Sequence, residues 1–174
     1  EPDSDISMAT SKFPTQLNDA QLALSSIGQY DVAASPLQMA MVAAGIANDG
    51  VLMEPYLTKS VRAANLQTVW THKDTPMSTP MTRESAKQLQ QMMVSVVNNG
   101  TGRNARIDGV TVGGKTGTAQ TSPDKPPYAW FVGWSDKPKV AVAVFVESSN
   151  TERSEIAGGR LGAPIARDVI EALR

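Results

Sequence analysis

The apolar run VAVAVFV, residues 140–146, limits most strongly how this chain of 174 residues can fold. Its apolar residues do not alternate with polar ones, which is typical of a strand covered on both faces. Two further strands are predicted before it, over 110–121 and 129–135, and the short link SDKP predicts a hairpin between the last two strands. Three strands with so apolar a member need further neighbours, so they predict part of a larger antiparallel sheet.

Helices are expected on both sides of the strands in sequence. The clearest covers 36–48, because Ser35 is a good N-cap, Pro36 suits the first helical position and Gly50 supplies a left-handed stop. Its apolar residues run nearly all the way round, which predicts a buried helix. Helical spacing predicts further helices over 18–27, over 83–98 with Leu89, Met92 and Met93 inward, and over 164–173 with Ile165, Val169 and Ile170 inward.

Residues 51–73 alternate only partly between apolar and polar types, which predicts a small exposed hairpin with Asn65 near its middle. The following segment, DTPMSTPM, is predicted to be a loop. The order of helices, three antiparallel strands and a closing helix indicates an α+β fold in one domain, 1–174.

Composition excludes several kinds of function. The net charge is -1 without a basic run, so no nucleic-acid partner is expected. There is no cysteine, and no acidic or histidine cluster has metal-ligand spacing, so neither a metal nor another cofactor is predicted. No stretch has the roughly 20 apolar residues of a membrane span, and the start lacks signal-peptide features. Any export signal or membrane anchor is therefore expected upstream of Glu1.

Lys115, Thr116, Gly117 and Thr118 are the candidate site residues, in the string VGGKTGTAQ. An ammonium and two hydroxyls presented on one face of a strand can hold a carboxylate and support proton transfer. Gly117 lets a ligand lie against the backbone, and the Thr118 N–H can donate into an oxyanion hole. The competing interpretation is a strand with an exposed lysine and two threonines.

Other candidate nucleophiles and bases are weaker. Ser122 and Lys125 match Ser-x-x-Lys, but the prolines that follow them stop any helix that would bring the two side chains together. Ser148 begins a match to Ser-x-Asn, in a predicted turn after a strand. His72, the single histidine, is predicted to be exposed and without a catalytic role.

Longer strings of the sequence resemble the C-terminal part of class B penicillin-binding transpeptidases, over about 16–174. A GTG string about a dozen residues before GKTGTAQ, with AWFVGW after it, is far more specific than a bare Lys-Thr-Gly. The matching strings are IGQYDVAASPLQMAMVAAGIANDG, MMVSVVNNGTGRNARIDGVTVGGKTGTAQ, AWFVGWSDKPKVAVAVFVE and GGRLGAPIARDVIEALR.

The resemblance implies a β-lactamase-like fold, a five-stranded antiparallel sheet flanked by helices, of which this chain would supply about three strands and the closing helix. It also implies peptidoglycan cross-linking. In this family a serine attacks the penultimate D-alanine of a stem peptide, and β-lactams acylate the same serine. By the resemblance, Lys115 and Thr118 are catalytic, and Thr116, Gly117 and Thr118 bind the substrate.

The order of motifs departs from the family pattern. Ser-x-x-Lys and Ser-x-Asn should precede Lys-Thr-Gly by well over a hundred residues, yet only 114 residues precede Lys115, and the matches at Ser122 and Ser148 follow it. We therefore expect the chain to be the C-terminal portion of a transpeptidase domain, inactive alone. The rest of the domain is an expected partner, besides stem peptides, β-lactams and division or elongation proteins. The expected location is the outer face of the bacterial membrane.

Two further functions fit the same fold. A serine β-lactamase shares the Lys-Thr-Gly position but adds a group that activates water for deacylation. A non-catalytic β-lactam sensor uses the fold to signal drug binding across a membrane. The TGTAQ and SPLQMA strings favour the transpeptidase. A partner-binding module without chemistry has no support from composition.

Overall fold

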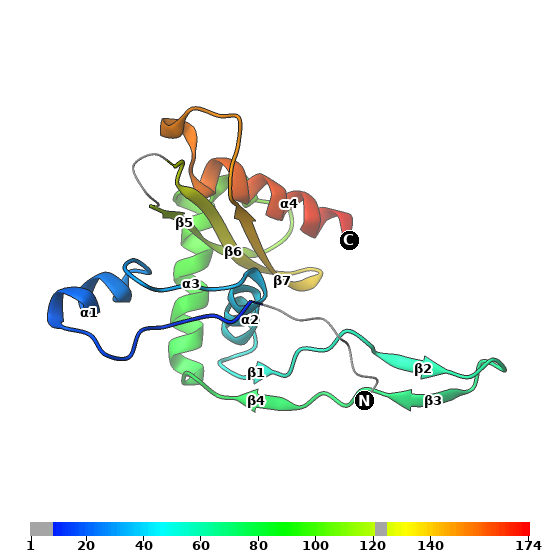
Figure 1. Cartoon of the computed structure of the whole chain (residues 1–174). Helices are drawn as coiled ribbons and strands as arrows, with labels where there is room; N and C mark the ends of the chain where they lie inside the picture. Colours follow the sequence, from blue (N-terminus) through cyan, green and yellow to red (C-terminus); the bar gives the residue numbers. More distant parts are fainter. Residues whose placement is uncertain (1–8, 121–124) are drawn as a thin grey trace.

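A computed structural model describes residues 9–120 and 125–174. Its centre is an antiparallel sheet in the order β5-β6-β7, formed by β5 (Val112–Ala119), β6 (Tyr128–Asp136) and β7 (Lys139–Val146) (Figure 1). Asp136 pairs with Lys139 at the β6–β7 turn, which confirms the predicted hairpin. The three strands and the closing helix therefore form as the sequence predicts.

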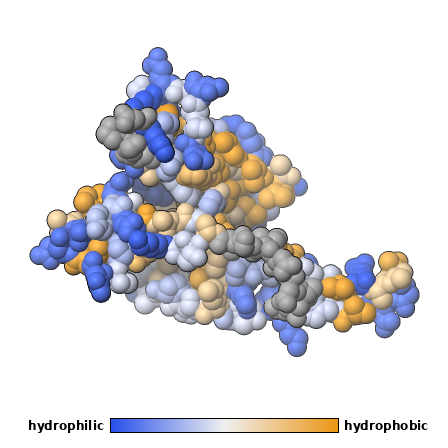
Figure 2. Space-filling view, viewed as in Figure 1, coloured by the Kyte–Doolittle hydropathy of each residue, from blue (hydrophilic) through white to orange (hydrophobic). Residues whose placement is uncertain are grey.

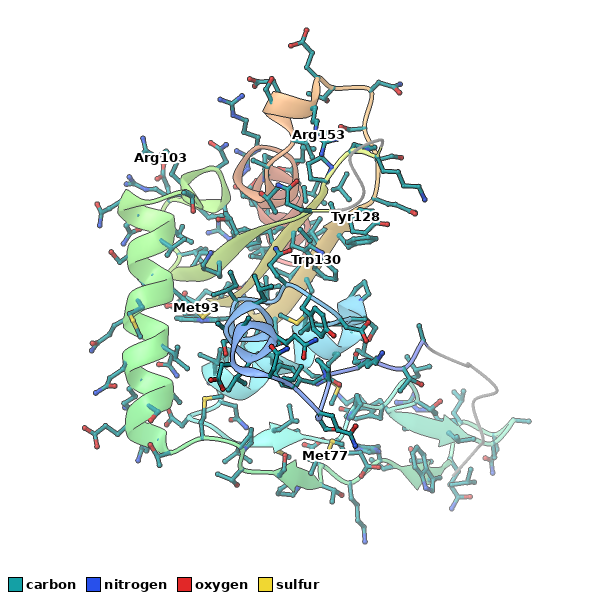
Figure 3. All side chains as sticks on the ribbon, turned by 60° about the vertical axis from the view of Figure 1, so that its left-hand side comes forward. Met77, Met93, Arg103, Tyr128, Trp130 and Arg153 are labelled. Atoms are coloured by element: carbon teal, nitrogen blue, oxygen red, sulfur yellow. The ribbon has the colours of Figure 1, made fainter. Side chains whose placement is uncertain are left out.

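Helices cover both faces of this sheet. On one face, α4 (Ala163–Ala172) packs over Phe131, and their contact is part of a core that includes Val142, Val144 and Ile170. On the other face, Trp134 packs with Ile46 of α2 (Pro36–Ala47) and Met93 of α3 (Arg83–Asn99). Met93 lies on the side of α3 that faces the sheet (Figure 3). The core therefore extends through the sheet, with β6 in its middle.

The prediction that 140–146 is covered on both faces is confirmed for most of the run. Val142 and Val144 are buried on the α4 face, and Ala141 and Ala143 are half-buried where α2 packs against β7. Phe145 is the exception, because it is 36% exposed. Tyr128 and Trp130 of β6 pack around its ring.

Three of the four predicted helices have a side-chain cap directly before their first residue, whereas α4 follows Gly162 and has none. The Asn18 side chain accepts a hydrogen bond from the Gln21 N–H in a capping box at α1 (Asp19–Ser26). Ser35 accepts from the Gln38 N–H at 3.2 Å, at the start of α2, and Thr82 caps α3 in the same way. These side chains satisfy N–H groups that the helix itself leaves unpaired.

The faces of the helices differ from the predictions. In α2, Ala43, Gly45 and Ile46 are buried, residues 37–41 are half-buried and the rest are exposed, so the prediction of a buried helix is confirmed for only part of its surface. In α4, Ile170 is fully buried but Ile165 and Val169 are 46% and 43% exposed, because Ala163 and Ala166 occupy the contact with the sheet instead. Met92 of α3 is likewise exposed. Small residues permit the closest approach of a helix to a sheet. The spacing of apolar residues alone does not show that the alanines, and not the larger side chains, form this contact.

Residues 51–81 form a ribbon that projects from the helices and the sheet (Figure 1). At its base, β1 (Leu52–Met53) pairs with β4 (Pro76–Ser78), and farther out β2 (Ser60–Arg62) pairs with β3 (Thr68–Thr71). The exposed hairpin is therefore confirmed. The loop predicted over 74–81 is wrong at β4, whose pairing with β1 joins segments far apart in sequence. Figure 2 shows apolar residues at the far end of this ribbon and on α4.

Two short 3-10 helices, η1 (Arg103–Ala105) and η2 (Arg153–Glu155), and a π-helix, η3 (Gly158–Gly162), lie in the connections. The π-helix leads directly into α4 and was not predicted. Among the described residues, no helix combines the length and apolar character needed to cross a bilayer.

Candidate active site

The four candidate residues lie in the second half of β5. Among the described strands, β5 pairs only with β6, so its other edge is an outer edge of the sheet. Lys115 and Thr118 are exposed, and Thr116 and Gly117 are half-buried. The candidate residues are therefore accessible along one edge of a strand that is held firmly on its other side.

The pleat of β5 separates the lysine from the threonines. A Cβ at Gly114 would meet the Phe131 ring at 2.3 Å, so Gly114 points to the α4 face. Thr116 and Thr118 follow at intervals of two and share that face, whereas Lys115 points to the other. The expectation that ammonium and hydroxyls lie on one face is therefore wrong. Both kinds of group can meet a ligand only at the outer edge of the strand.

The backbone at this edge is suited to a ligand. The Lys115 ammonium donates a hydrogen bond to the Thr116 carbonyl. That carbonyl points away from β6, because the backbone groups of the next residue, Gly117, lie beside the Trp130 carbonyl oxygen of β6. In an antiparallel strand the N–H and C=O of one residue point the same way, and residues two apart repeat that direction. The Thr118 N–H therefore also points outward. It can donate to an oxygen of a ligand lying along β5.

Thr101 is a further candidate site residue, which the sequence did not predict. It follows directly after Gly100, where α3 ends, and its hydroxyl lies 2.7 Å from the hydroxyl of Thr116. The two hydroxyls form a pair on the face of the sheet that α4 covers, one from the segment after α3 and one from β5. The GTG string that marks the family contains Thr101, but nothing in its spacing shows that its hydroxyl reaches β5.

A glycine turn at the start of η3 packs against this site. A Cβ at Gly158 would lie 1.9 Å from the Trp130 carbonyl oxygen and 2.9 Å from the Gly117 nitrogen. At Gly159 it would lie 2.1 Å from the Thr101 carbonyl oxygen. Real Cβ atoms do not approach backbone atoms so closely, so only glycine fits at either position. The turn therefore holds the threonine-bearing segments together through backbone contact, in a π-helix of the kind often found at functional sites.

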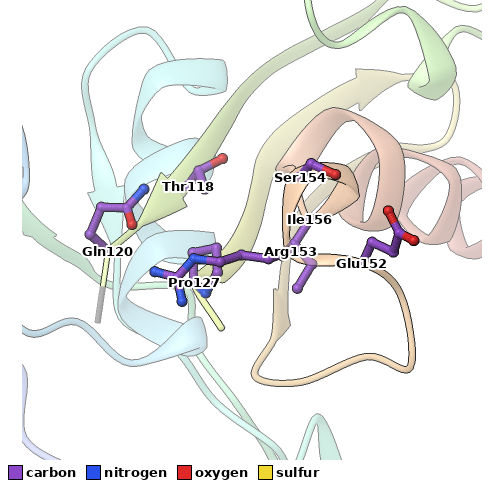
Figure 4. A pocket seen from close by; sticks show the side chains of 7 residues that line it. All are labelled: Thr118, Gln120, Pro127, Glu152, Arg153, Ser154 and Ile156. Atoms are coloured by element: carbon purple, nitrogen blue, oxygen red, sulfur yellow. The ribbon is translucent and has the colours of Figure 1, made fainter. Parts of the chain in front are cut away.

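An open pocket of about 620 Å³ adjoins the C-terminal end of β5 (Figure 4). Arg153 extends from η2 toward Pro127, and its guanidinium donates to the Lys125 carbonyl at 2.7 Å. Thr118 lies on the wall of this pocket, so a ligand at the Thr118 N–H can continue into it. The lining residues are Thr118, Gln120, Pro127, Glu152, Arg153, Ser154 and Ile156.

The weaker candidates are not brought to this site. Ser122 lies outside the described residues. Ser148 is exposed just after β7 ends, as predicted. His72 lies on the ribbon, half-buried and stacked on Tyr56 with ring centroids 3.7 Å apart, so the prediction that it is exposed is wrong. Within the described part of the chain, no group of three or more His, Cys, Asp or Glu could hold a metal ion.

Comparison with known proteins agrees with the fold and the site. The family model described as penicillin binding protein transpeptidase domain matches residues 2–171. That match covers nearly the whole chain, and the chain therefore belongs to the penicillin-binding transpeptidase domain family.

Within this family the chain is similar to penicillin-binding protein A of mycobacteria. It is 40% identical over 172 residues to "Peptidoglycan D,D-transpeptidase PbpA" of Mycolicibacterium smegmatis, covering 96% of this chain and 35% of that protein. The crystal structure of PBPA from Mycobacterium tuberculosis is 38% identical with a TM-score of 0.85, covering 95% of this chain and 40% of that one. The structure of a penicillin G acyl-enzyme complex of penicillin-binding protein A from M. tuberculosis is also 38% identical, with a TM-score of 0.82. The match covers 95% of this chain and 38% of that one. The chain thus spans about a third of the length of these curated relatives.

Proposed function

We propose that this chain, 1–174, is the C-terminal portion of a serine D,D-transpeptidase domain that cross-links peptidoglycan. The nucleophilic serine of Ser-x-x-Lys and the Ser-x-Asn motif would come from residues outside this chain. The 40% identity to a D,D-transpeptidase and the likeness to its acyl-enzyme complexes support this function. No serine of the described residues lies within a helix with a lysine one turn later, which is what the first motif requires.

The proposed reaction transfers an acyl group twice. The serine oxygen attacks the carbonyl of the penultimate D-alanine, the peptide C–N bond breaks, and the terminal D-alanine leaves with the proton on its nitrogen. An amine of a neighbouring stem peptide then attacks the ester, which forms the cross-link and returns the proton to the serine. Each attack passes through a tetrahedral oxyanion, and the Thr118 N–H would donate to that oxygen.

The remaining residues would bind the end of the donor peptide. The Thr116 and Thr118 hydroxyls, with that of Thr101, would hold the terminal carboxylate by hydrogen bonds. Lys115, across the pleat, would contribute its positive charge and support the path of the proton. The observation that carries the proposal is the hydroxyl pair of Thr101 and Thr116, 2.7 Å apart beside an outward-facing Thr118 N–H. Such an arrangement at a sheet edge suits a ligand with a carboxylate next to a reactive carbonyl.

The proposed ligands are stem peptides ending in D-Ala-D-Ala and β-lactams, which have the same carboxylate and reactive carbonyl. No cofactor enters the proposal. The proposed location is the outer face of the bacterial membrane, with an anchor supplied outside this chain, and proteins of division or elongation are proposed as partners.

A serine β-lactamase and a non-catalytic β-lactam sensor are the alternatives within the same fold. Rapid hydrolysis of benzylpenicillin by the complete protein would favour the β-lactamase, because a transpeptidase keeps the drug as a stable ester. Stable acylation without any cross-linking of donor and acceptor peptides would favour the sensor.

Labelling with a fluorescent penicillin, followed by denaturing electrophoresis, tests the proposal. The complete protein should be labelled, and the chain of 174 residues alone should not. Replacing Lys115 by Ala should slow labelling of the complete protein by about two to three orders of magnitude, since it removes the positive charge that supports the path of the proton beside the reacting groups. Lys139→Ala, on the exposed start of β7, is the matched control and should label at the original rate. A labelled band from the 174-residue chain, or an unchanged rate in Lys115→Ala, would contradict the assignment.

A further inference from the structure

Asn104 connects two segments that lie far apart in sequence. It belongs to η1, just after α3, and its side-chain Nδ2 donates to the carbonyl oxygen of Gly159 at 2.8 Å, across 55 residues of sequence. Gly159 is the second residue of η3. This one side chain therefore joins the segment that follows α3 to the turn that precedes α4.

The position of Gly159 affects the hydroxyl pair of Thr101 and Thr116. A Cβ on Gly159 would be 2.1 Å from the Thr101 carbonyl oxygen and 3.5 Å from Cγ2 of Thr116. Gly159 thus lies against the Thr101 backbone, and the side chain of Thr116 borders the same space. Gly159 has no room to move closer to Thr101, because the two backbones are already packed. The hydrogen bond from Asn104 limits movement of Gly159 away from Thr101.

We propose that Asn104 is a positioning residue for recognition of the ligand's carboxylate. It acts through Gly159, which it holds against Thr101, and so keeps the Thr101 hydroxyl within hydrogen-bonding distance of Thr116. This inference rests on the proposed function, in which the hydroxyl pair binds the carboxylate. It predicts that a change at Asn104 affects ligands with a free carboxylate more than ligands without one.

The chemistry of the side chain defines the variants. An amide NH₂ donates to a carbonyl, whereas an aspartate of the same shape has only acceptor oxygens. Asn104→Asp therefore sets a carboxylate against the Gly159 carbonyl, and Asn104→Ala removes the bond without adding a charge. Asn98→Asp, on an exposed turn of α3, adds the same charge without altering the side chain that bonds to Gly159, and is the matched control.

The test uses the complete transpeptidase and compares benzylpenicillin with its methyl ester. In Asn104→Asp and Asn104→Ala, the second-order acylation constant for benzylpenicillin should fall about fivefold to tenfold, the loss typical of one ordinary hydrogen bond. The constant for the ester should fall less than twofold. Asn98→Asp should change neither. Equal losses for the acid and the ester, or no loss in either Asn104 variant, would overturn the inference.

A second measurement separates this inference from the proposed function. Crystal structures of the complete protein and of Asn104→Asp should show the Thr101 and Thr116 hydroxyls moving beyond 3.5 Å apart in the variant. If the unaltered protein is not acylated at all, the proposed function fails and this distance alone decides the role of Asn104. An unchanged hydroxyl pair in the variant would overturn the positioning role, whatever the acylation rates.

Discussion

The sheet of β5, β6 and β7 and the ribbon of residues 51–81 are both antiparallel, but their surroundings differ. The sheet has eight-residue pairings without a register shift on β5, and helices cover both of its faces. The ribbon has strands of two to four residues with a register shift in each pair, and its apolar side chains at Leu57, Leu66 and Val69 are largely exposed. Pairing alone therefore does not distinguish the two regions. The two regions differ in how far their side chains are buried, and the candidate site lies on the sheet, the region with the buried core.

The largest expected difference between the regions concerns single apolar side chains. Phe131→Ala removes a fully buried ring from the core under α4, and we expect it to lower the free energy of unfolding by about 3–5 kcal/mol. Val69→Ala on the ribbon, where the side chain is 62% exposed, should cost less than about 1 kcal/mol. Urea unfolding followed by circular dichroism measures both. Similar losses would mean that the ribbon is part of the same core.

A smaller effect is expected at Gly50, where α2 ends and the ribbon begins. Its φ is +93°, and a Cβ would lie 2.5 Å from the Met81 carbonyl oxygen, so Gly50→Ala should cost about 2 kcal/mol or more. Gly109→Ala is the control, since its φ is also positive, at +75°, but nothing lies within 4 Å of the added methyl group. It should cost about 1 kcal/mol. Thermal unfolding of the two variants compares the values, and equal costs would show that the contact with Met81 does not constrain the chain.

The smallest effect is expected at Leu66, at the tip of the ribbon, and it should have the opposite sign. Leu66 has a φ of +67° and is 75% exposed. Its left-handed backbone conformation is therefore strained, and its side chain gains little from burial in return. We expect Leu66→Gly to raise the free energy of unfolding by about 0.5 kcal/mol, the strain relieved less the added chain entropy. Leu66→Ala keeps the strain and should give no gain. A loss of stability in Leu66→Gly would show that the exposed leucine packs on the ribbon after all.

Local signals were enough to predict most of the elements. Ser35, Pro36 and Thr82 act within one turn of the helix that they begin, so their effect can be read from neighbouring residues. The hairpin between β6 and β7 is equally local, because its predicted strands are joined by the short link SDKP. The sequence also predicted that the Lys-Thr-Gly string lies on a strand, because it directly continues the apolar run before it.

What could not be predicted depends on contacts between distant segments. The pairing of β1 with β4 involves two or three residues on each side, too few to leave a pattern. The π-helix at 158–162 begins at Gly158, which lies against the backbone of β6, and the sequence alone does not show which segment a glycine approaches. Thr101 was missed for the same reason: its partner Thr116 is 15 residues away, on another element.

The contact between Gly50 and Met81 also has a consequence for how the chain could change in length. The segments that enter and leave the ribbon touch at that point, and Arg83 and Asp49 form an ion pair beside it at 3.0 Å. The ribbon of residues 51–81 thus begins and ends at neighbouring points of the fold. Insertions or deletions there would change the closure entropy only slowly with length, and would leave the ends of α2 and α3 where they are. The ribbon can therefore be treated as an exchangeable module, whose size can vary without moving β5.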